Sequence, residues 1–235
     1  MTIFTVVNIM TNREYKNLAK EAPMDVGRLT QALKTPERLW MAILLINQYE
    51  ETTTVQEFST ISGLSVGLIS KFANILRESG FLANGQRLKL LQPGPLLDIV
   101  RDLYYFEANQ TIPYYSEETP EQLIEKIARM KKPYALTRMC GAGLVAPFVR
   151  YQRVDLYIPD QNDLEDWKKN LNLIDVEVTG NVNLVIPQAP QILKQTQTIK
   201  KCQVVNNIQL YLDLYKYPAR GREQAEHLRE QVLKI

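Results

Sequence analysis

Seven side chains between positions 65 and 89 combine hydrogen-bonding groups with positive charge: Ser65, Ser70, Lys71, Asn74, Arg77, Arg87 and Lys89. An asparagine amide can pair bidentately with adenine, and a lysine ammonium can reach the acceptor atoms of guanine. From Ile61 to Leu91 the only acidic residue is Glu78, and a local excess of positive charge attracts phosphates whatever the base sequence. These residue types suit contact with double-stranded DNA, and we assign none of them a catalytic role.

The elements that must position these side chains begin with two helices. Hydrophobic spacing predicts a helix from about residue 55 to residue 62, then a turn at Gly63 and Leu64. A second helix follows, which Ser65 caps with its hydroxyl and Gly80 ends. Its core-facing residues are Ile69, Phe72, Ala73 and Leu76. Its opposite face carries Ser65, Ser70, Lys71, Asn74 and Arg77.

A β-hairpin is predicted directly after the second helix. Asn84-Gly85 stands between two short runs that alternate apolar and polar residues, which is a strong short-range hairpin signal. Helix, turn, helix and hairpin in this order are typical of a winged helix-turn-helix, which presents its second helix to the major groove of DNA. Arg87 on the hairpin is expected to contact phosphates or the minor groove. Two alternatives are a polar helix face that is only solvated, and a winged helix that docks a protein partner.

The composition indicates a soluble protein of the reducing cytoplasm. The chain has 235 residues, a net charge of +2, and two cysteines, which make no disulfide framework. A charge this small excludes a general polyanion binder, so any nucleic-acid site must be local. The first 18 residues lack the basic segment and long apolar run of a signal peptide. The best apolar run, residues 39–46, is too short to span a bilayer. We therefore expect a cytoplasmic protein without a membrane partner.

Four segments are expected along the chain, and the predicted fold class is α+β. Residues 1–33 form an N-terminal arm, and residues 34–107 form the winged helix-turn-helix domain, whose last helix ends near Phe106. Residues 108–119 lack periodicity and contain Pro113, so they are predicted to be a linker. Residues 120–235 form a mixed α+β domain. Its expected helices are 121–130, 163–172, 207–215 and 222–233, and its expected strands are 154–158, 174–178 and 183–186, the last two joined by a turn at 179–181.

The most enzyme-like feature is Cys140-Gly141-Ala142-Gly143 followed by Asp155. Nucleotidyltransferases cradle phosphates on a glycine turn at a helix start and hold two metal ions with paired carboxylates on a later strand. Tyr157 stands where the second carboxylate is needed, so the two-metal mechanism fails. We favour a strand with an incidental aspartate; a degenerate nucleotidyltransferase-like scaffold without activity is the alternative.

Other catalytic or metal-binding arrangements have weaker support. Asp163, Asp175 and Glu177 could be metal-binding carboxylates of a nuclease, but no lysine follows Glu177 at the required spacing. Cys140 is expected to be a small buried residue, and nothing in the sequence ties His227, the single histidine, to a nucleophile. No phosphate-binding loop or dinucleotide motif is present. We therefore predict no enzymatic activity, no metal site and no cofactor.

Three C-terminal segments point to a family. They are residues 133–143, where PYALT precedes GAG, residues 153–158 (RVDLYI) and residues 207–221 (NIQLYLDLYKYPARG). Together they resemble the AbiEi family, the antitoxins of type IV toxin–antitoxin systems, and with the winged helix the resemblance covers roughly residues 35–235. The block at 207–221 is its most specific part, because winged helices are shared by many unrelated regulators.

The resemblance implies a bacterial or archaeal regulator whose winged helix represses its own operon. It also implies that the C-terminal domain counters a nucleotidyltransferase toxin, without necessarily binding it stably. The residues that would read operator DNA are Ser65, Ser70, Lys71 and Asn74, with Arg87 on the wing. Binding to an inverted repeat is compatible with a homodimer. The alternatives are a winged-helix module that binds a protein partner and, with less support, a metal-dependent nucleotidyltransferase-like enzyme.

Overall fold

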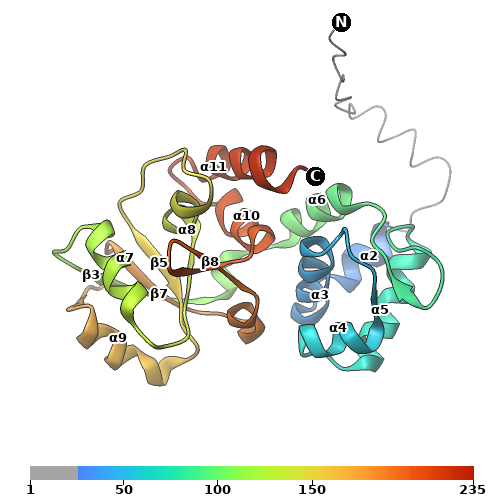
Figure 1. The fold of residues 1–235 in the computed structure, drawn as a ribbon, viewed down its shortest axis with the longest axis horizontal. Coiled ribbons are helices and arrows are strands. Elements are labelled where there is room, and N and C mark those ends of the chain that lie inside the picture. The colour runs from blue at the N-terminus through green and yellow to red at the C-terminus, as the bar shows by residue number, and fades with distance from the viewer. Residues whose placement is uncertain (1–25) are drawn as a thin grey trace, which may run out of the picture.

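The computed structural model describes residues 26–235, in which helices α2 to α6 form one part and a seven-stranded sheet with its helices forms the other (Figure 1). The chain is a mixed α+β protein, as the sequence predicts. The predicted N-terminal arm lies outside the described residues up to residue 25. Its last residues belong to the folded chain instead, because α2 (Val26–Ala32) packs against α5 and buries Leu29, and the next residue, Leu33, is also buried.

Residues 26–103 fold into helices and one small sheet. Their bounds are α2 (Val26–Ala32), α3 (Pro36–Asn47), β1 (Thr53–Thr54), α4 (Val55–Ser62), α5 (Val66–Glu78), β2 (Arg87–Leu88) and α6 (Pro93–Leu103). Helix α4 begins with a capping box between Thr54 and Glu57 and ends at Gly63, whose φ of 71° is left-handed. Helix α5 begins at Ser65, whose hydroxyl oxygen accepts a hydrogen bond from the Leu68 N–H. The predicted bounds of α4 and the predicted cap of α5 are confirmed.

A three-residue turn joins α4 to α5, and the chain bends by 115° between the two helices. After α5 the chain folds back on itself, because Leu82 pairs with Leu90 and β2 pairs antiparallel with β1. Gly85, in the loop between Leu82 and Leu90, has a φ of 119°. The chain reversal predicted after the second helix is present, because Leu82 and Ala83 meet Leu90 and Lys89. The pairing differs from the prediction, since Arg87 and Leu88 pair with β1.

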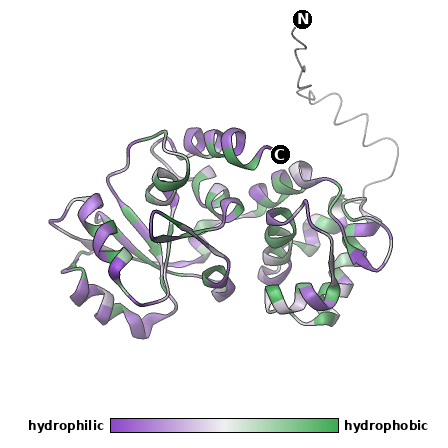
Figure 2. Cartoon of the chain, viewed as in Figure 1, coloured by the Kyte–Doolittle hydropathy of each residue, from purple (hydrophilic) through white to green (hydrophobic). Residues whose placement is uncertain are grey.

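Helix α3 connects the two parts of the molecule. The seven consecutive residues from Trp40 to Ile46 are all buried, and α3 is hydrophobic over most of its length in Figure 2. A helix that is apolar all round must be covered on every side, whereas a surface helix needs only an apolar stripe. Helix α3 packs against α6 and also against α10 of the sheet part. The buried residues of both parts consequently form one hydrophobic cluster.

The large sheet is mixed and has the strand order β6-β3-β7-β5-β4-β9-β8. Its strands are β3 (Gln110–Tyr115), β4 (Ala135–Thr137), β5 (Val154–Tyr157), β6 (Ile174–Asp175), β7 (Val182–Ile186), β8 (Thr196–Ile199) and β9 (Cys202–Val205). The pairs β5–β7 and β4–β9 are parallel, and the other neighbours are antiparallel. Every residue of β4 and β5 is buried, so helices or loops cover both faces of the sheet centre.

The helices of the sheet part are α7 (Pro120–Arg129), α8 (Arg138–Val145), α9 (Leu164–Asn170), α10 (Asn207–Tyr215) and α11 (Gly221–Leu228), which continues as a π-helical turn (Arg229–Leu233). Short 3-10 turns lie at Phe106–Ala108, Gln161–Asp163 and Pro190–Lys194. Helix α8 packs against β4 and β5 and also against α10 and α11. It therefore lies between the sheet and the C-terminal helices.

The predicted linker at residues 108–119 is wrong for half of its length, because residues 110–115 form β3. Pro113 lies opposite Asn183 of β7, whereas β6 pairs with β3 only at Tyr114 and Tyr115. The other side of β3 is therefore free of a strand partner at Pro113, which is where a strand tolerates a proline. The segment is polar and aperiodic because most of it lies at the sheet edge.

The predicted turn that joins strands 174–178 and 183–186 is also wrong in its pairing. Strands β6 and β7 both pair with β3, which lies between them. Gly180 runs so close to β3 that a Cβ there would lie 1.8 Å from the Tyr114 carbonyl oxygen. The β8–β9 hairpin was not predicted, and the helix expected to end near Phe106 ends at Leu103.

Candidate functional site

Helix α5 and the hairpin after it lie at the end of the molecule that is remote from the large sheet (Figure 1). The four predicted core residues of α5 are fully buried: Ile69, Phe72, Ala73 and Leu76. On the opposite side Ser65, Lys71 and Asn74 are exposed, whereas Ser70 is half-buried. The structure thus brings most of the polar residues predicted on this helix to one accessible face.

The amide of Asn74 is held in place by a neighbour on the same helix. Its Oδ1 accepts a hydrogen bond from Arg77 Nη1 at 3.0 Å. An amide oxygen has two lone pairs and the amide nitrogen has two protons, so Asn74 keeps one acceptor position and its donors for a partner outside the protein. Bidentate pairing with adenine needs one of each. The Asn74 side chain is therefore oriented by Arg77 and exposed at the surface of α5.

Two of the predicted basic residues make contacts within the protein. Arg77 is half-buried, and its guanidinium donates to the carbonyl oxygens of Ala83 at 3.4 Å and Arg87 at 3.5 Å, both in the hairpin segment. Lys89 Nζ donates to the carbonyl oxygen of Glu50 at 3.0 Å, in the loop after α3. Arg77 thus holds the hairpin against α5, and Lys89 holds it against that loop. Arg87 is exposed on the hairpin.

The single acidic residue between positions 61 and 91 is paired with a cation from another helix. Glu78, at the end of α5, forms an ion pair with Arg28 of α2, and both side chains are 56% exposed. Such an exposed pair contributes at most about 1 kcal/mol to stability. The ion pair also neutralises the negative charge of Glu78, and the cation that does so lies outside residues 61–91. Lys71 and Arg87 are exposed in this segment. The pKa of the Glu57 carboxyl group in α4 is lowered first by hydrogen bonds at the start of that helix and further by the nearby Arg87.

Val66 and Gly67 also lie at the exposed start of α5 and were missed by the sequence reasoning. Val66 is 42% exposed, and a Cβ placed on Gly67 would meet nothing within 4 Å. An apolar side chain can contact the methyl group of thymine, and a glycine lets another backbone come close. Only polar residues were considered as contacts, but Val66 and Gly67 precede Ser70 and Lys71 by four residues and so share their face.

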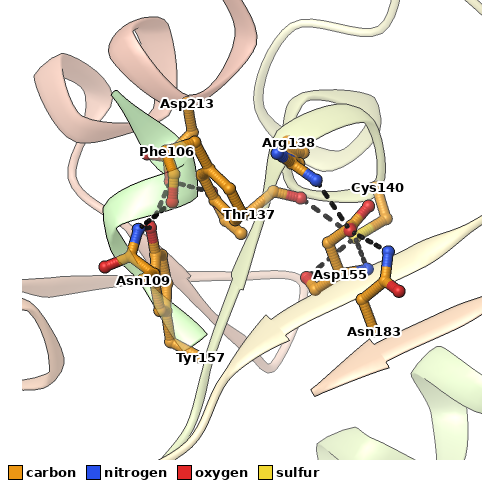
Figure 3. Close-up of polar contacts among 9 residues, drawn as sticks. All are labelled: Phe106, Asn109, Thr137, Arg138, Cys140, Asp155, Tyr157, Asn183 and Asp213. Atoms are coloured by element: carbon orange, nitrogen blue, oxygen red, sulfur yellow. Dashed lines mark hydrogen bonds and ion pairs between the residues drawn. The ribbon is translucent and has the colours of Figure 1, made fainter. Parts of the chain in front are cut away.

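A buried polar cluster surrounds Asp155 in the centre of the sheet (Figure 3). Asp155 Oδ1 accepts hydrogen bonds from Asn183 Nδ2 at 2.7 Å and from Arg138 Nη1 at 3.5 Å. The thiol of Cys140 lies 3.3 Å from both the backbone N and the backbone O of Asp155. Burial raises the pKa of Asp155, and the nearby Arg138 acts in the opposite direction. The guanidinium of Arg138 also lies 3.3 Å from the ring centre of Phe106.

Tyr157, the residue in place of a second carboxylate, belongs to a different buried cluster. Its hydroxyl donates to Asp213 Oδ2 at 3.1 Å, and the Thr137 hydroxyl donates to the same oxygen. The other oxygen of Asp213 accepts from the Tyr104 hydroxyl and from Gln209 Nε2 at 2.8 Å. Figure 3 shows Thr137 between the two aspartates. Tyr157 therefore ties β5 to α10 in the core.

The glycines of the enzyme-like segment allow close packing. They lie within α8, and a Cβ on Gly141 would be 3.1 Å from Leu210 Cδ1 and 3.2 Å from the carbonyl oxygen of Leu136. A Cβ on Gly143 would be 2.4 Å from the ring of Tyr151. The absence of side chains thus lets α8 approach α10 and the sheet. Because residues 140–143 are helical, they do not form the glycine turn with which nucleotidyltransferases bind phosphates.

Cys140 lies in the core, and His227 stacks on an aromatic ring. Cys140 is fully buried, as predicted, and burial together with the neighbouring Asp155 raises its pKa to about 12. The thiol is therefore protonated at neutral pH, whereas a nucleophile must be a thiolate. His227 on α11 stacks on Phe148, with ring centres 4.5 Å apart.

Two of the three carboxylates considered for a nuclease site, Asp163 and Asp175, are paired separately with lysines. Asp163 lies 3.1 Å from Lys132, and Asp175 forms an ion pair with Lys168. Among the residues that the structure describes, no three His, Cys, Asp or Glu side chains are placed to hold a metal ion. These acidic residues serve to connect α9 to its neighbours.

Comparison with family models, with curated proteins and with solved structures finds no match for this chain. No single helix within residues 26–235 is long and apolar enough to cross a membrane.

Proposed function

We propose that the chain is a winged helix-turn-helix regulator that binds double-stranded operator DNA through α5 and the hairpin. The observation that carries this proposal is the exposed face of the first nine residues of α5, Val66 to Asn74. They follow a three-residue turn, begin at the cap residue Ser65, and expose Lys71 and Asn74 at one end of the molecule. In helix-turn-helix proteins, the start of the second helix enters the major groove and contacts base edges.

The position and contacts of each side chain suggest which part of the DNA it would bind. Lys71 and Asn74 would read base edges, and Val66 would contact a thymine methyl group. Arg87 on the hairpin would contact a phosphate, which adds affinity without sequence preference. Arg77 and Lys89 would act indirectly, because their cationic groups already bind backbone carbonyls and hold the hairpin in place.

The test is binding to DNA from upstream of the protein's own gene, compared with random DNA, at two salt concentrations. The wild-type protein should prefer its own DNA at both. The double variant Lys71→Ala, Arg87→Ala should lose roughly tenfold to a hundredfold in affinity, and each lost phosphate contact should lower the salt slope by about 1. The control is Arg150→Ala, Lys169→Ala, which removes the same charge from exposed positions of the sheet part.

A steric variant provides a second readout. Gly67→Leu adds a side chain where the protein has open space, so the protein should fold normally. The same side chain would stand between α5 and the DNA and should abolish specific binding. Equal affinity of wild type, the double variant and Gly67→Leu would refute this use of α5.

We further propose that this regulator is an AbiEi-like antitoxin that represses its own operon and counters a nucleotidyltransferase toxin. This part rests on the resemblance of the C-terminal segments, above all residues 207–221. Co-expression of this chain with a nucleotidyltransferase toxin encoded next to its gene should restore the growth that the toxin alone inhibits. The Lys71→Ala, Arg87→Ala variant should restore growth equally well, because neutralisation is assigned to the C-terminal part. Failure of the wild-type chain to restore growth would restrict the protein to DNA binding.

A further inference from the structure

A pocket of about 540 Å³ lies between the helical part of the molecule and the sheet part. Leu39, Trp40 and Ile43 of α3 line it, and Ala189 and Ile192 line it from the segment after β7. Binding sites for small organic molecules have volumes of roughly 300–1,000 Å³ and mostly apolar walls with a few polar groups. The size of this pocket and its apolar wall fit that class.

The pocket is open to solvent where three exposed residues line it: Lys34, Tyr105 and Gln188. Lys34 lies in the turn between α2 and α3, and its side chain makes no hydrogen bond or ion pair within residues 26–235. Tyr105 is 61% exposed, and Lys216 Nζ lies 3.9 Å from the centre of its ring. The mouth of the pocket therefore has one ammonium group available to a ligand and a second one close by.

The charge of Lys34 is not balanced inside the pocket, because no acidic residue of the described chain lines it. Three acidic residues are neighbours of lining residues in the sequence: Glu37, Asp102 and Glu107. All three are exposed and do not line the pocket, and Asp102 is paired with Arg101. The charged residue that a bound molecule would meet is therefore a cation.

These observations define the class of ligand. A lysine ammonium is a point charge on a flexible stem, so it can meet an anionic group at the mouth. The wall beyond the mouth has no charged residue, so the charge of a ligand must stay at the mouth while its body is apolar. We propose that the pocket binds a small organic anion, with its apolar body against α3 and its single negative charge beside Lys34. This proposal does not depend on DNA binding.

Three probes with one rigid skeleton separate the effect of charge from the effect of shape. They are adamantane-1-carboxylate, the uncharged adamantane-1-carboxamide and the cationic 1-adamantylammonium ion. Calorimetric titration of the wild-type protein should show saturable binding of the carboxylate. The carboxamide should bind about threefold to fivefold more weakly, which is the effect of one exposed ion pair, and the ammonium ion at least about tenfold more weakly.

Variants of Lys34 test the position of the charge. Lys34→Gln should bind the carboxylate and the carboxamide with affinities equal to within about twofold, and Lys34→Glu should reverse the order of the three probes. The control Lys169→Glu makes the same change of charge at an exposed position of α9 and should keep the wild-type order. Because both lysines are exposed, all three variants should fold.

Trp40 and two alanines test the position of the apolar body. In Trp167→Phe, Trp40 is the single tryptophan, and its fluorescence should change with the carboxylate at the affinity that calorimetry gives. Ala108→Phe and Ala189→Phe place a ring in the pocket from two different segments. Each should weaken binding of the carboxylate and of the carboxamide alike, by at least about tenfold. Circular dichroism shows whether each variant is folded.

The wild-type protein and the Lys34 variants decide the proposal even if Trp167→Phe or a filling variant does not fold. Absence of saturable carboxylate binding overturns the proposal, and so do equal affinities for the three probes. It is also overturned if Lys34→Glu keeps the wild-type order, or if folded Ala108→Phe and Ala189→Phe bind the carboxylate as tightly as the wild-type protein.

Discussion

Asp213 joins separate segments of the core through its two carboxylate oxygens. It accepts hydrogen bonds from Tyr104 after α6, Thr137 at the end of β4, Tyr157 on β5 and Gln209 on α10. Burial raises the pKa of Asp213, and the donors around it oppose that shift. Tyr157 stands where a two-metal site would need a second carboxylate. Its role in this structure is to donate a hydrogen bond to Asp213.

The raised pKa of Asp213 predicts a pH dependence of stability. In the unfolded chain its pKa returns to the ordinary value of 3.8. Between that value and the higher folded-state pKa, the folded protein binds more protons than the unfolded chain. The free energy of unfolding should therefore fall as the pH rises through this window, and the raised pKa of Asp155 acts in the same direction.

Urea unfolding between pH 4 and the neutral range measures this dependence. The variant Asp213→Asn cannot ionise, so its unfolding free energy should fall less steeply with pH than that of the wild-type protein. The control Asp160→Asn changes an exposed aspartate and should keep the wild-type slope. Identical slopes for all three proteins would show that Asp213 is not the group that titrates.

At the scale of elements, the turn between α4 and α5 determines where the exposed helix face points. Gly63 ends α4 with a φ of 71°, a conformation that side chains with a Cβ disfavour. Gly67 lies four residues later in the first turn of α5, where a Cβ would meet open space. The two glycines are therefore under opposite constraints, although both stand close together in the sequence.

The same substitution should consequently have opposite effects at these two positions. Gly63→Ala should lower the free energy of unfolding by about 1–2 kcal/mol, because alanine must adopt the left-handed conformation. Gly67→Ala should raise it by up to about 1 kcal/mol, because alanine has the higher helix propensity. Urea unfolding of the two variants beside the wild type measures both. A change of the same sign at both positions would contradict the geometry of the turn.

At the scale of the whole molecule, the two parts are held together by more than the connecting chain. Helix α3 is covered by α10 of the sheet part. Arg229 in the C-terminal π-helical turn forms an ion pair with Asp98 of α6 at 2.8 Å. Lys216 Nζ, after α10, donates to the carbonyl oxygen of Tyr104 at 2.8 Å. Separation of the parts would expose apolar surface of α3, so we expect them to unfold together.

The two tryptophans can test this cooperativity, because Trp40 lies in α3 and Trp167 in α9. The single-tryptophan variants Trp167→Phe and Trp40→Phe report on one part each. In each variant, the urea midpoint of tryptophan fluorescence should coincide with the midpoint of circular dichroism for the whole chain. Two separated midpoints within one variant would instead indicate independent domains, as the predicted linker at 108–119 implied.

The sequence by itself determined the elements that depend on neighbouring residues. The bounds of α4, the cap at Ser65, the four buried residues of α5 and the chain reversal after α5 were all predicted. Capping, helical periodicity and turn conformation arise between residues only a few positions apart. The same holds for the exposed face with Lys71 and Asn74, because one helix carries both residues.

Only the tertiary structure decided the features that join distant parts of the chain. Residues 110–115 became a strand because β7 and β6 pair with them from more than 50 residues away. The sequence predicts DNA contacts for Arg77 and Lys89, and only the fold shows that backbone carbonyls lie beside their cationic groups. A pocket of about 540 Å³ has walls from α3, α10 and the segments that flank the sheet, which meet only in the folded chain. Short-range sequence patterns do not predict these contacts, because the residues that make them come together only when the whole chain buries its apolar surface.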